Sequence, residues 1–274
     1  MLRFLFWNLN RKRLAAAIGH IVRSREVDVV LLAENVIPPG EVVWALNSTG
    51  TADYTYAPGQ CERIDVFSRL SGRMLVPVHE SRHWSIRHLR LPGRTSIVVA
   101  AIHGISKAHW KDDSQAHECI RFADDLRRSE QEVGHGNSLV IGDLNMNPFE
   151  SAMVSAVGLN ASMSRAIAHR GARTVQGRSY HFFYNPMWGH FGDLAASPPG
   201  TYYREESEHV GYFWHMFDQV LLRPTLLQYF EHENLEIVSQ IAPGGVQTSL
   251  LSSRGVPDAS IGSDHLPIVL GLTV

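Results

Sequence analysis

The first third of the chain alternates between apolar runs and one amphipathic stretch. Residues 2–7 (LRFLFW) and 27–33 (VDVVLLA) are mainly apolar, which predicts two buried strands. Between them, apolar residues recur at helical spacing among basic ones, so a helix is expected over about residues 11–25. A strand, a helix and a strand within about 30 residues are typical of an α/β layer.

The middle of the chain changes to alternation and β-branched residues. This pattern predicts four strands, at residues 61–69, 73–80, 83–91 and 95–102. A short helix is expected before them at 38–47, and a longer amphipathic helix after them at about 112–133. Residues 139–141 then form another apolar run, which predicts a buried strand that Gly142 is expected to end.

The last part of the chain is less regular. Strands are predicted for 217–222 (FDQVLL), for 235–241 and for the apolar end of the chain. Residues 180–217 hold 12 of the 25 aromatic residues, so an aromatic-rich insertion is expected at about 178–217. We see no repeat, low-complexity tract or linker, and therefore expect residues 1–274 to form a single domain.

Composition excludes several classes of protein. The formal charge of −2 and the pI near 6.7 exclude a protein that binds nucleic acid through overall basic charge. Two cysteines cannot make a disulfide framework or a cysteine-based zinc site. No apolar run approaches the roughly 18 residues of a membrane span, and the N-terminus does not look like a signal peptide. We expect a cytoplasmic protein without stable membrane association; the sequence says nothing of protein partners.

Polar residues follow the predicted strands at several points. Asn8, Glu34 and His103 each come directly after an apolar run, and Asp143 with Asn145 follows another. Sites in open α/β sheets form outside the carboxyl ends of strands, so these side chains are candidates for chemistry. The alternative is structural, because Asp and Asn also favour turns and a Glu can cap a helix.

Three motifs carry a family resemblance. GDLN at 142–145, FDQVLL at 217–222 and SDHLPIVL at 263–270 together resemble the endonuclease/exonuclease/phosphatase superfamily, and the likeness runs from residue 2 to residue 272. The resemblance implies an α/β fold, a four-layered sandwich of two mixed β-sheets flanked by helices.

The segment AIHG points to one branch of that superfamily. His103 is similar to the histidine of pancreatic-type deoxyribonuclease and the neutral sphingomyelinases, where abasic-site endonucleases have a tyrosine. CERIDVFSR resembles the segment of that deoxyribonuclease whose glutamate pairs with the histidine, which nominates Glu62 as the partner of His103. The chain departs from the pattern at Glu34, where it has AEN instead of the more usual QE.

The resemblance implies a metal site made of oxygen ligands. Asn8 and Glu34, completed or supported by Asp264, would hold Mg²⁺, with Mn²⁺ as a possible substitute. Such a metal would act mainly as a Lewis acid on a phosphate oxygen.

The remaining matched residues would move protons and hold the phosphoryl group. Asp143 would orient or deprotonate an attacking water, and Asn145 would hold a phosphoryl oxygen. His265 would be positioned by Asp218, whose carboxylate raises the pKa of an imidazole. His103 with its expected partner would be the second acid/base group; which histidine gives the proton stays open.

The expected function is a Mg²⁺-dependent phosphodiesterase, most simply a nuclease that cleaves nucleic acid by direct attack of water. The alternative keeps the chemistry and changes the substrate to a phospholipid, a phosphoinositide or a small nucleotide. A non-catalytic binding module would be expected to lose one of Glu34, Asp143, Asp264 or His265, and all four are present. DNA against RNA and endo- against exonucleolytic cleavage stay open.

The aromatic stretch bears on the substrate. Tyr184 and Trp188 flank a proline in YNPMW, and a rigid turn there would present a ring to a base. Arg178 lies upstream, and with Arg165, Arg170 and Arg173 it would hold phosphates. The alternative is a long loop packed by its own aromatic rings.

Overall fold

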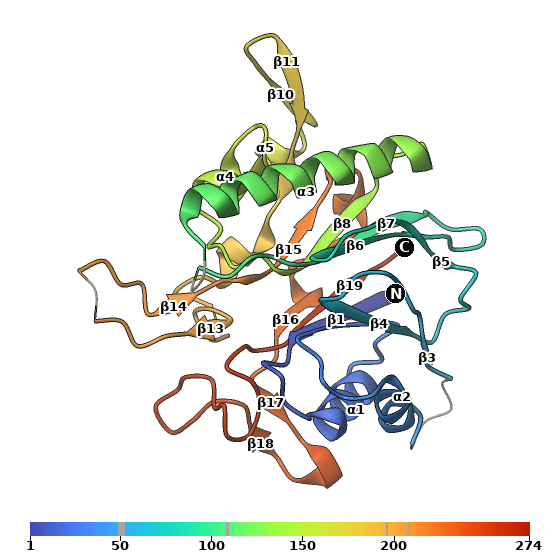
Figure 1. Ribbon diagram of the computed structural model, residues 1–274, viewed down its shortest axis with the longest axis vertical. Helices are drawn as coiled ribbons and strands as arrows, with labels where there is room; N and C mark the ends of the chain where they lie inside the picture. Colours follow the sequence, from blue (N-terminus) through green and yellow to red (C-terminus); the bar gives the residue numbers. More distant parts are fainter. Residues whose placement is uncertain (49–52, 108–109, 196, 208) are drawn as a thin grey trace.

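Two β-sheets pack face to face in the computed structural model, which describes residues 1–48, 53–107, 110–195, 197–207 and 209–274. Helices cover the outer face of each sheet, so the molecule has four layers (Figure 1). The expected fold class is confirmed. The buried core cluster contains strand residues from both sheets, including Phe6, Leu31, Ile141 and Val220.

The first sheet is built from the two ends of the chain. Within the described residues it has six strands, and β1 pairs in parallel with β2 and antiparallel with β19. In spatial order its strands are β16 (Leu235–Ile237), β19 (Ile268–Leu272), β1 (Leu2–Asn8), β2 (Val29–Ala33), β4 (Ile64–Ser68) and β3 (Thr55–Tyr56).

The second sheet comes from the middle of the chain. Its described part has seven strands, with β7 and β8 parallel and β15 antiparallel to β8. In spatial order its strands are β5 (Leu75–Glu80), β6 (Trp84–Leu89), β7 (Ile97–His103), β8 (Ser138–Asp143), β15 (Asp218–Leu222), β12 (Phe183–Tyr184) and β9 (Ala161–Ser162).

In the part of the chain that the structure describes, three two-stranded ribbons and several helices complete the fold. The ribbons are β10 (Ala172–Val175) with β11 (Arg178–His181), β13 (Tyr202–Tyr203) with β14 (Trp214–His215), and β17 (Gln240–Ile241) with β18 (Thr248–Ser249). The α-helices are α1 (Ala15–Ser24), α2 (Pro39–Asn47), α3 (Asp112–Val133), α4 (Ser151–Val154) and α5 (Arg165–Ala168). Short 3₁₀ helices are η1 (Pro186–His190), η2 (Pro224–Tyr229), η3 (His232–Asn234) and η4 (Pro243–Gly245).

The helices divide between the two sheets. In Figure 1, α1 and α2 lie under the six-stranded sheet and α3 lies over the seven-stranded one. Helix α3 buries one stripe that includes Cys119, Phe122 and Leu126, and it ends at Gly134, whose φ of 83° is the left-handed conformation that commonly ends a helix. None of the helices in the described part of the chain is long and apolar enough to cross a membrane.

Three expected boundaries need correction. The first helix begins at Ala15 and not at residue 11, because Asn10 and Arg11 have positive φ angles (44° and 57°) that a helix cannot include. The strand expected over 235–241 is divided between two sheets. Strand β8 does not stop at Gly142 but continues through Asp143.

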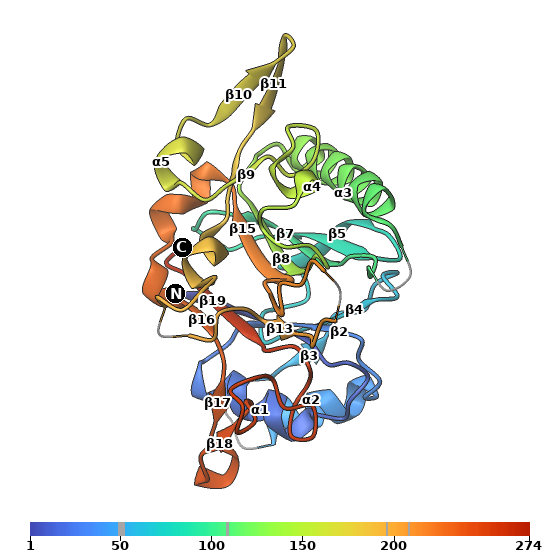
Figure 2. The same cartoon turned by 90° about the vertical axis from the view of Figure 1, so that its left-hand side faces the viewer.

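The aromatic-rich stretch is not wholly an appendage. Phe183 and Tyr184 form β12, which pairs with β15 and β9 inside the seven-stranded sheet. By contrast, the ribbon of β10 and β11 projects at one end of the long axis in both views (Figure 2).

Gly142 allows β8 to approach β7 closely. A Cβ at this position would lie 2.0 Å from the carbonyl oxygen of Ile102 and 2.8 Å from its nitrogen. Real side chains do not approach a neighbouring backbone so closely, and the backbone of a buried sheet cannot easily move away. The glycine therefore fixes the contact between the two strands that carry His103 and Asp143.

We predict that Gly142→Ala lowers the free energy of unfolding by about 1–3 kcal/mol, the usual scale of overpacking in a core. Gly136→Ala is the matched control, because a Cβ there would meet nothing within 4 Å. Urea denaturation of both variants measures the difference. Equal stability of the two variants would contradict the close approach.

Candidate active site

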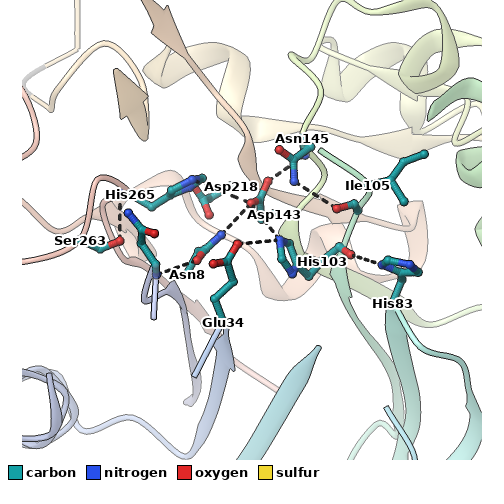
Figure 3. A network of polar contacts seen from close by, with 12 residues as sticks. Asn8, Glu34, His83, His103, Ile105, Asp143, Asn145, Asp218, Ser263 and His265 are labelled. Atoms are coloured by element: carbon teal, nitrogen blue, oxygen red, sulfur yellow. Dashed lines mark hydrogen bonds and ion pairs between the residues drawn. The ribbon is translucent and has the colours of Figure 1, made fainter. Parts of the chain in front are cut away.

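The ends of neighbouring strands bring the candidate residues together. Asn8 ends β1, and Glu34 follows β2, which runs parallel to β1. In the other sheet, Asp143 at the end of β8 is in register with His103 on β7 and with Asp218 on β15. The site therefore lies at the ends of central strands, where the two sheets face each other (Figure 3).

Asp143 lies at the centre of this group. Its Oδ2 accepts a hydrogen bond of 2.9 Å from Asn8 Nδ2, and its Oδ1 accepts one of 2.8 Å from the backbone N–H of Asn145. Nε2 of His103 is 3.8 Å from Oδ2, and Nε2 of His265 is 4.0 Å from the same oxygen. One buried carboxylate oxygen thus faces two imidazoles from the two sheets.

Asp218 and His265 form a buried pair. Oδ2 of Asp218 is 2.8 Å from Nδ1 of His265, and the aspartate is completely buried. Burial alone would lower the pKa of His265, but the carboxylates of Asp218 and Asp143 raise it to about 10. The imidazole is therefore protonated at neutral pH, with Nδ1–H directed to Asp218 and Nε2–H on the side of Asp143.

A cavity of about 210 Å³ opens over these groups. It is lined by Asn8, Glu34, His103, Ser106, Lys107, Asp143, Asn145, Tyr202, Arg204, Glu206, His215, Phe217, Asp264 and His265. Carboxylates, imidazoles and two cationic side chains thus share one small space. An anionic substrate can be held here only if positive charge balances the carboxylates.

Two residues of the site have an unusual backbone. Glu34 and Asn145 have φ angles of 48° and 51°, in the left-handed region. Asparagine tolerates this conformation, whereas a glutamate there costs on the order of 1 kcal/mol. The turn nevertheless places the Glu34 carboxylate in the cavity, with Oε1 3.5 Å from Nε2 of His103. Such strain is found most often at functional sites.

Two sets of side chains could hold a metal. Asp143, Asp218 and His265 place ligand atoms within 4.8 Å of one another. Nδ1 of His265 is already bonded to Asp218, so in this set only Nε2, which is 4.0 Å from Oδ2 of Asp143, is left to face a metal. The second set is Asn8, Glu34 and Asp264, which line the same cavity. Oδ1 of Asn8 also accepts a hydrogen bond of 3.0 Å from the backbone N–H of Asn10.

Glu62 does not lie where it was expected. It precedes β4 in a loop, its side chain is 66% exposed, and its carboxylate is 3.1 Å from Nε of Arg82. The expected pairing with His103 is therefore wrong. His103 faces Glu34 and Asp143 instead, while its backbone carbonyl contacts Nδ1 of His83.

The expected substrate residues are scattered. Tyr184 is only 4% exposed and its hydroxyl contacts His232, so it cannot offer a ring to a substrate, and that expectation is wrong. Arg178 begins β11, on the projecting ribbon, and does not line the cavity. Trp188 lies in η1, half-buried, with its ring centroid 6.2 Å from that of Phe149.

A second wall of the cavity is formed by side chains that do not lie at the carboxyl ends of the predicted apolar strands. It consists of side chains around the ribbon of β13 and β14: Tyr202, Arg204, Glu206, His215 and Phe217. The sequence shows that this segment is rich in aromatic residues. However, β13 and β14 have only two residues each, and strands this short produce no periodic pattern in the sequence. Only the fold brings this ribbon to the metal-ligand candidates.

Comparison with known proteins identifies the fold. No model of a protein family matches the chain, and no curated protein does. Among solved structures, the endonuclease domain of TRAS1, a telomere-specific non-LTR retrotransposon, superimposes with a TM-score of 0.50 at 13% identity, covering 100% of this chain and 99% of that one. TDP2 from D. rerio, complexed with a single-strand DNA product, superimposes with a TM-score of 0.53 at 15% identity, covering 98% of this chain and 97% of that one.

An endonuclease/exonuclease/phosphatase family protein from Bacteroides thetaiotaomicron gives a TM-score of 0.54 at 12% identity, covering 98% of this chain and 96% of that one. The chain thus has the fold of endonuclease/exonuclease/phosphatase proteins over nearly its whole length. These structures do not select the branch of pancreatic-type deoxyribonuclease and neutral sphingomyelinase that the sequence pattern indicated.

The buried pair predicts a pH-dependent stability. Asp218→Asn leaves a buried imidazolium without its counter-charge, so in chelator at pH 6 we expect a loss of about 3–5 kcal/mol in the free energy of unfolding. The folded pKa of His265 is raised, so the contribution of the pair is complete below about pH 6.5 and is lost as the pH rises toward 10.

Urea denaturation from pH 6 to pH 9.5 measures the free energy of unfolding of the wild type and of Asp218→Asn. Asp193→Asn, at an exposed position, is the matched control. The curves of the wild type and Asp218→Asn should converge as the pH rises. A difference that stays constant over this range would contradict a protonated His265.

Proposed function

We propose that this protein is a metal-dependent phosphodiesterase that hydrolyses nucleic acid by direct attack of water. One cavity brings together two kinds of side chain, and this observation carries the proposal. Asp143, His103 and the Asp218–His265 pair can bind or move protons, and the carboxylates of Glu34 and Asp264 can bind a metal. The fold is shared with an endonuclease domain and with a protein solved with a DNA product, which supports the same chemistry.

The residues present fit a hard divalent cation. Glu34 and Asp264 supply carboxylates and Asn8 a carboxamide oxygen, the ligand types that Mg²⁺ prefers, and Mn²⁺ accepts the same set. When bound, the ion would supply Lewis-acid polarisation of a phosphate oxygen. It would also offset the negative charge that these carboxylates place in the cavity.

His265, Asp143 and His103 are assigned different roles according to whether each donates or accepts a proton. A protonated His265 cannot take a proton from water, so it acts as a hydrogen-bond donor and positive charge toward the phosphoryl oxygens. Asp143 is held as an acceptor by the hydrogen bonds from Asn8 and Asn145, which suits it to orient and deprotonate the attacking water. His103, whose Nε2 is 3.8 Å from Oδ2 of Asp143, would then be the group that gives a proton to the leaving oxygen.

A nucleic-acid substrate is supported by the aromatic surroundings of the site. Phe149 contacts the rings of Trp188 and Tyr212 at 6.2 and 5.2 Å, and Tyr212 contacts His215 of the cavity wall at 6.2 Å. A series of rings therefore leads outward from the cavity, and Tyr212 is 53% exposed. Bases of a single strand stack on such rings without regard to sequence.

A phospholipid or phosphoinositide is the second candidate. Leu194 and Val210 are 106% and 72% exposed, and Val210 lies on the loop that also carries Tyr212. Apolar side chains of this kind can contact a lipid surface. Parallel assays with DNA, RNA, phospholipid vesicles and a phosphomonoester separate the two substrate classes.

The metal prediction tests the proposal. We expect EDTA to abolish hydrolysis and Mg²⁺ or Mn²⁺ to restore it, and Glu34→Gln to lower activity severely because one metal ligand loses its charge. Glu132→Gln, at an exposed position on α3, is the control. Full activity in excess chelator would show that the proposal is wrong.

Both histidines are expected to act in the reaction. His103→Ala and His265→Ala should each lower kcat by at least about 10²-fold, the usual effect of losing an acid or base group for His103 and a donor to the reacting oxygens for His265. His117→Ala, on the exposed side of α3, should leave kcat unchanged. If either cavity variant turned over at the wild-type rate, that histidine would have only a structural role.

A further inference from the structure

The second wall of the cavity has no part in the metal or proton chemistry described above. We define it as the ribbon wall: Tyr202, Arg204, Glu206, His215 and Phe217. It lies in the same cavity as Asp143 and both histidines, so it must contact whatever group adjoins the scissile phosphate. Its chemistry therefore indicates what that group is.

A hydrogen-bond chain orients the wall. Oδ1 of Asn147 accepts from the backbone N–H of Met216 at 3.0 Å, which turns its Nδ2 toward Nδ1 of His215 at 3.1 Å. Nδ1 of His215 is therefore an acceptor, and its proton is on Nε2, which donates to Oε1 of Glu206 at 3.1 Å. Burial lowers the pKa of His215 against the opposing effect of Glu206, consistent with a neutral ring.

The second oxygen of Glu206 remains available. In the described part of the chain, Oε2 makes no hydrogen bond, and the side chain of Glu206 is 15% exposed. Gly211 packs against this oxygen, and a Cβ at residue 211 would lie 2.9 Å from Oε2, so a larger residue there would crowd it. One carboxylate oxygen is thus held by the imidazole and the other is left to accept a hydrogen bond in the cavity.

The rings of the same wall pack against one another. His215 and Phe217 are stacked at 4.6 Å with 29° between their planes, and Tyr202 is stacked on Phe217 at 5.4 Å with 21°. His215 and Phe217 are each only 7% exposed, so the stacking holds His215, and with it Glu206, in one position. The guanidinium of Arg204 lies at the same cavity and suits a flanking phosphate.

We infer that the ribbon wall binds a sugar with a free hydroxyl next to the scissile phosphate, with Oε2 of Glu206 accepting the hydroxyl proton. A carboxylate repels a phosphate oxygen and has no proton to donate to a carbonyl, so its partner is an O–H or N–H donor, and in a nucleotide the donor that adjoins the phosphate is the sugar hydroxyl. Carboxylates bind the ribose 2′-hydroxyl in the same way in dinucleotide sites. The inference rests on the proposed function and specifies its substrate as ribonucleotide.

Three oligonucleotides of one sequence test the assignment: ribo, deoxy and 2′-O-methyl. The last keeps the oxygen and loses the proton. For the wild type with Mg²⁺ we expect kcat/KM on the ribo form to exceed that on either analogue by about 10- to 100-fold, the scale of a hydrogen bond to a charged group.

Glu206→Gln sharpens the test. The inner oxygen must still accept from Nε2–H of His215, so the amide NH₂ would face the cavity and a donor would replace the acceptor. The preference for ribo over 2′-O-methyl should then collapse toward 1. Glu205→Gln is the matched control, because Glu205 is exposed and contacts Arg254 and Tyr203 instead. Thermal melting of both variants checks that they fold.

The outcomes are distinct. Equal hydrolysis of the three oligonucleotides by the wild type would overturn the sugar subsite and leave the phosphodiesterase proposal standing. An unchanged preference in Glu206→Gln would overturn the role of Glu206. Hydrolysis of short-chain phosphatidylinositol, but not of any oligonucleotide, would overturn the ribose assignment and the nucleic-acid substrate together. No hydrolysis of any phosphodiester would overturn the proposed function itself.

Discussion

The candidate site depends on polar contacts that join the two sheets at one edge of the sandwich. His265, which precedes β19 of the first sheet, pairs with Asp218 at the start of β15 in the second, and Asn8 of β1 bonds to Asp143 of β8. These groups are buried, so each is costly without its partner. The same contacts therefore fix how the sheets meet and hold the reactive groups in place, which links the packing of the sandwich to its chemistry.

The strand register explains why three chain segments converge on Asp143. Parallel pairing of β7 with β8 places His103 beside it, and antiparallel pairing of β8 with β15 places Asp218 beside it. Gly142 allows the close approach of β7 that this arrangement needs. The backbone ladder thus sets the positions of His103, Asp143 and Asp218 relative to one another.

Residues at the ends of strongly apolar strands could be predicted from the sequence, because strand ends are marked by the pattern itself. Asn8, Glu34, His103, Asp143 and His265 all line the cavity as a result. Glu62 and Tyr184 were placed wrongly because their surroundings are decided by tertiary contacts: Arg82 pairs with the first, and β12 takes the second into a sheet. Glu206 and His215 were not found because short ribbon strands leave no periodic signal.

We propose a division of labour in which Glu34, Asp264 and Asn8 hold the metal, Asp143 and His103 transfer protons, and the Asp218–His265 pair donates to the phosphoryl oxygens. A crystal soaked in Mn²⁺ would locate the metal through the anomalous signal of the ion. We expect a peak coordinated by Glu34, with Asp264 or Asn8 in its shell. A peak held between Asp143, Asp218 and His265 instead, or none at saturating Mn²⁺, would contradict it.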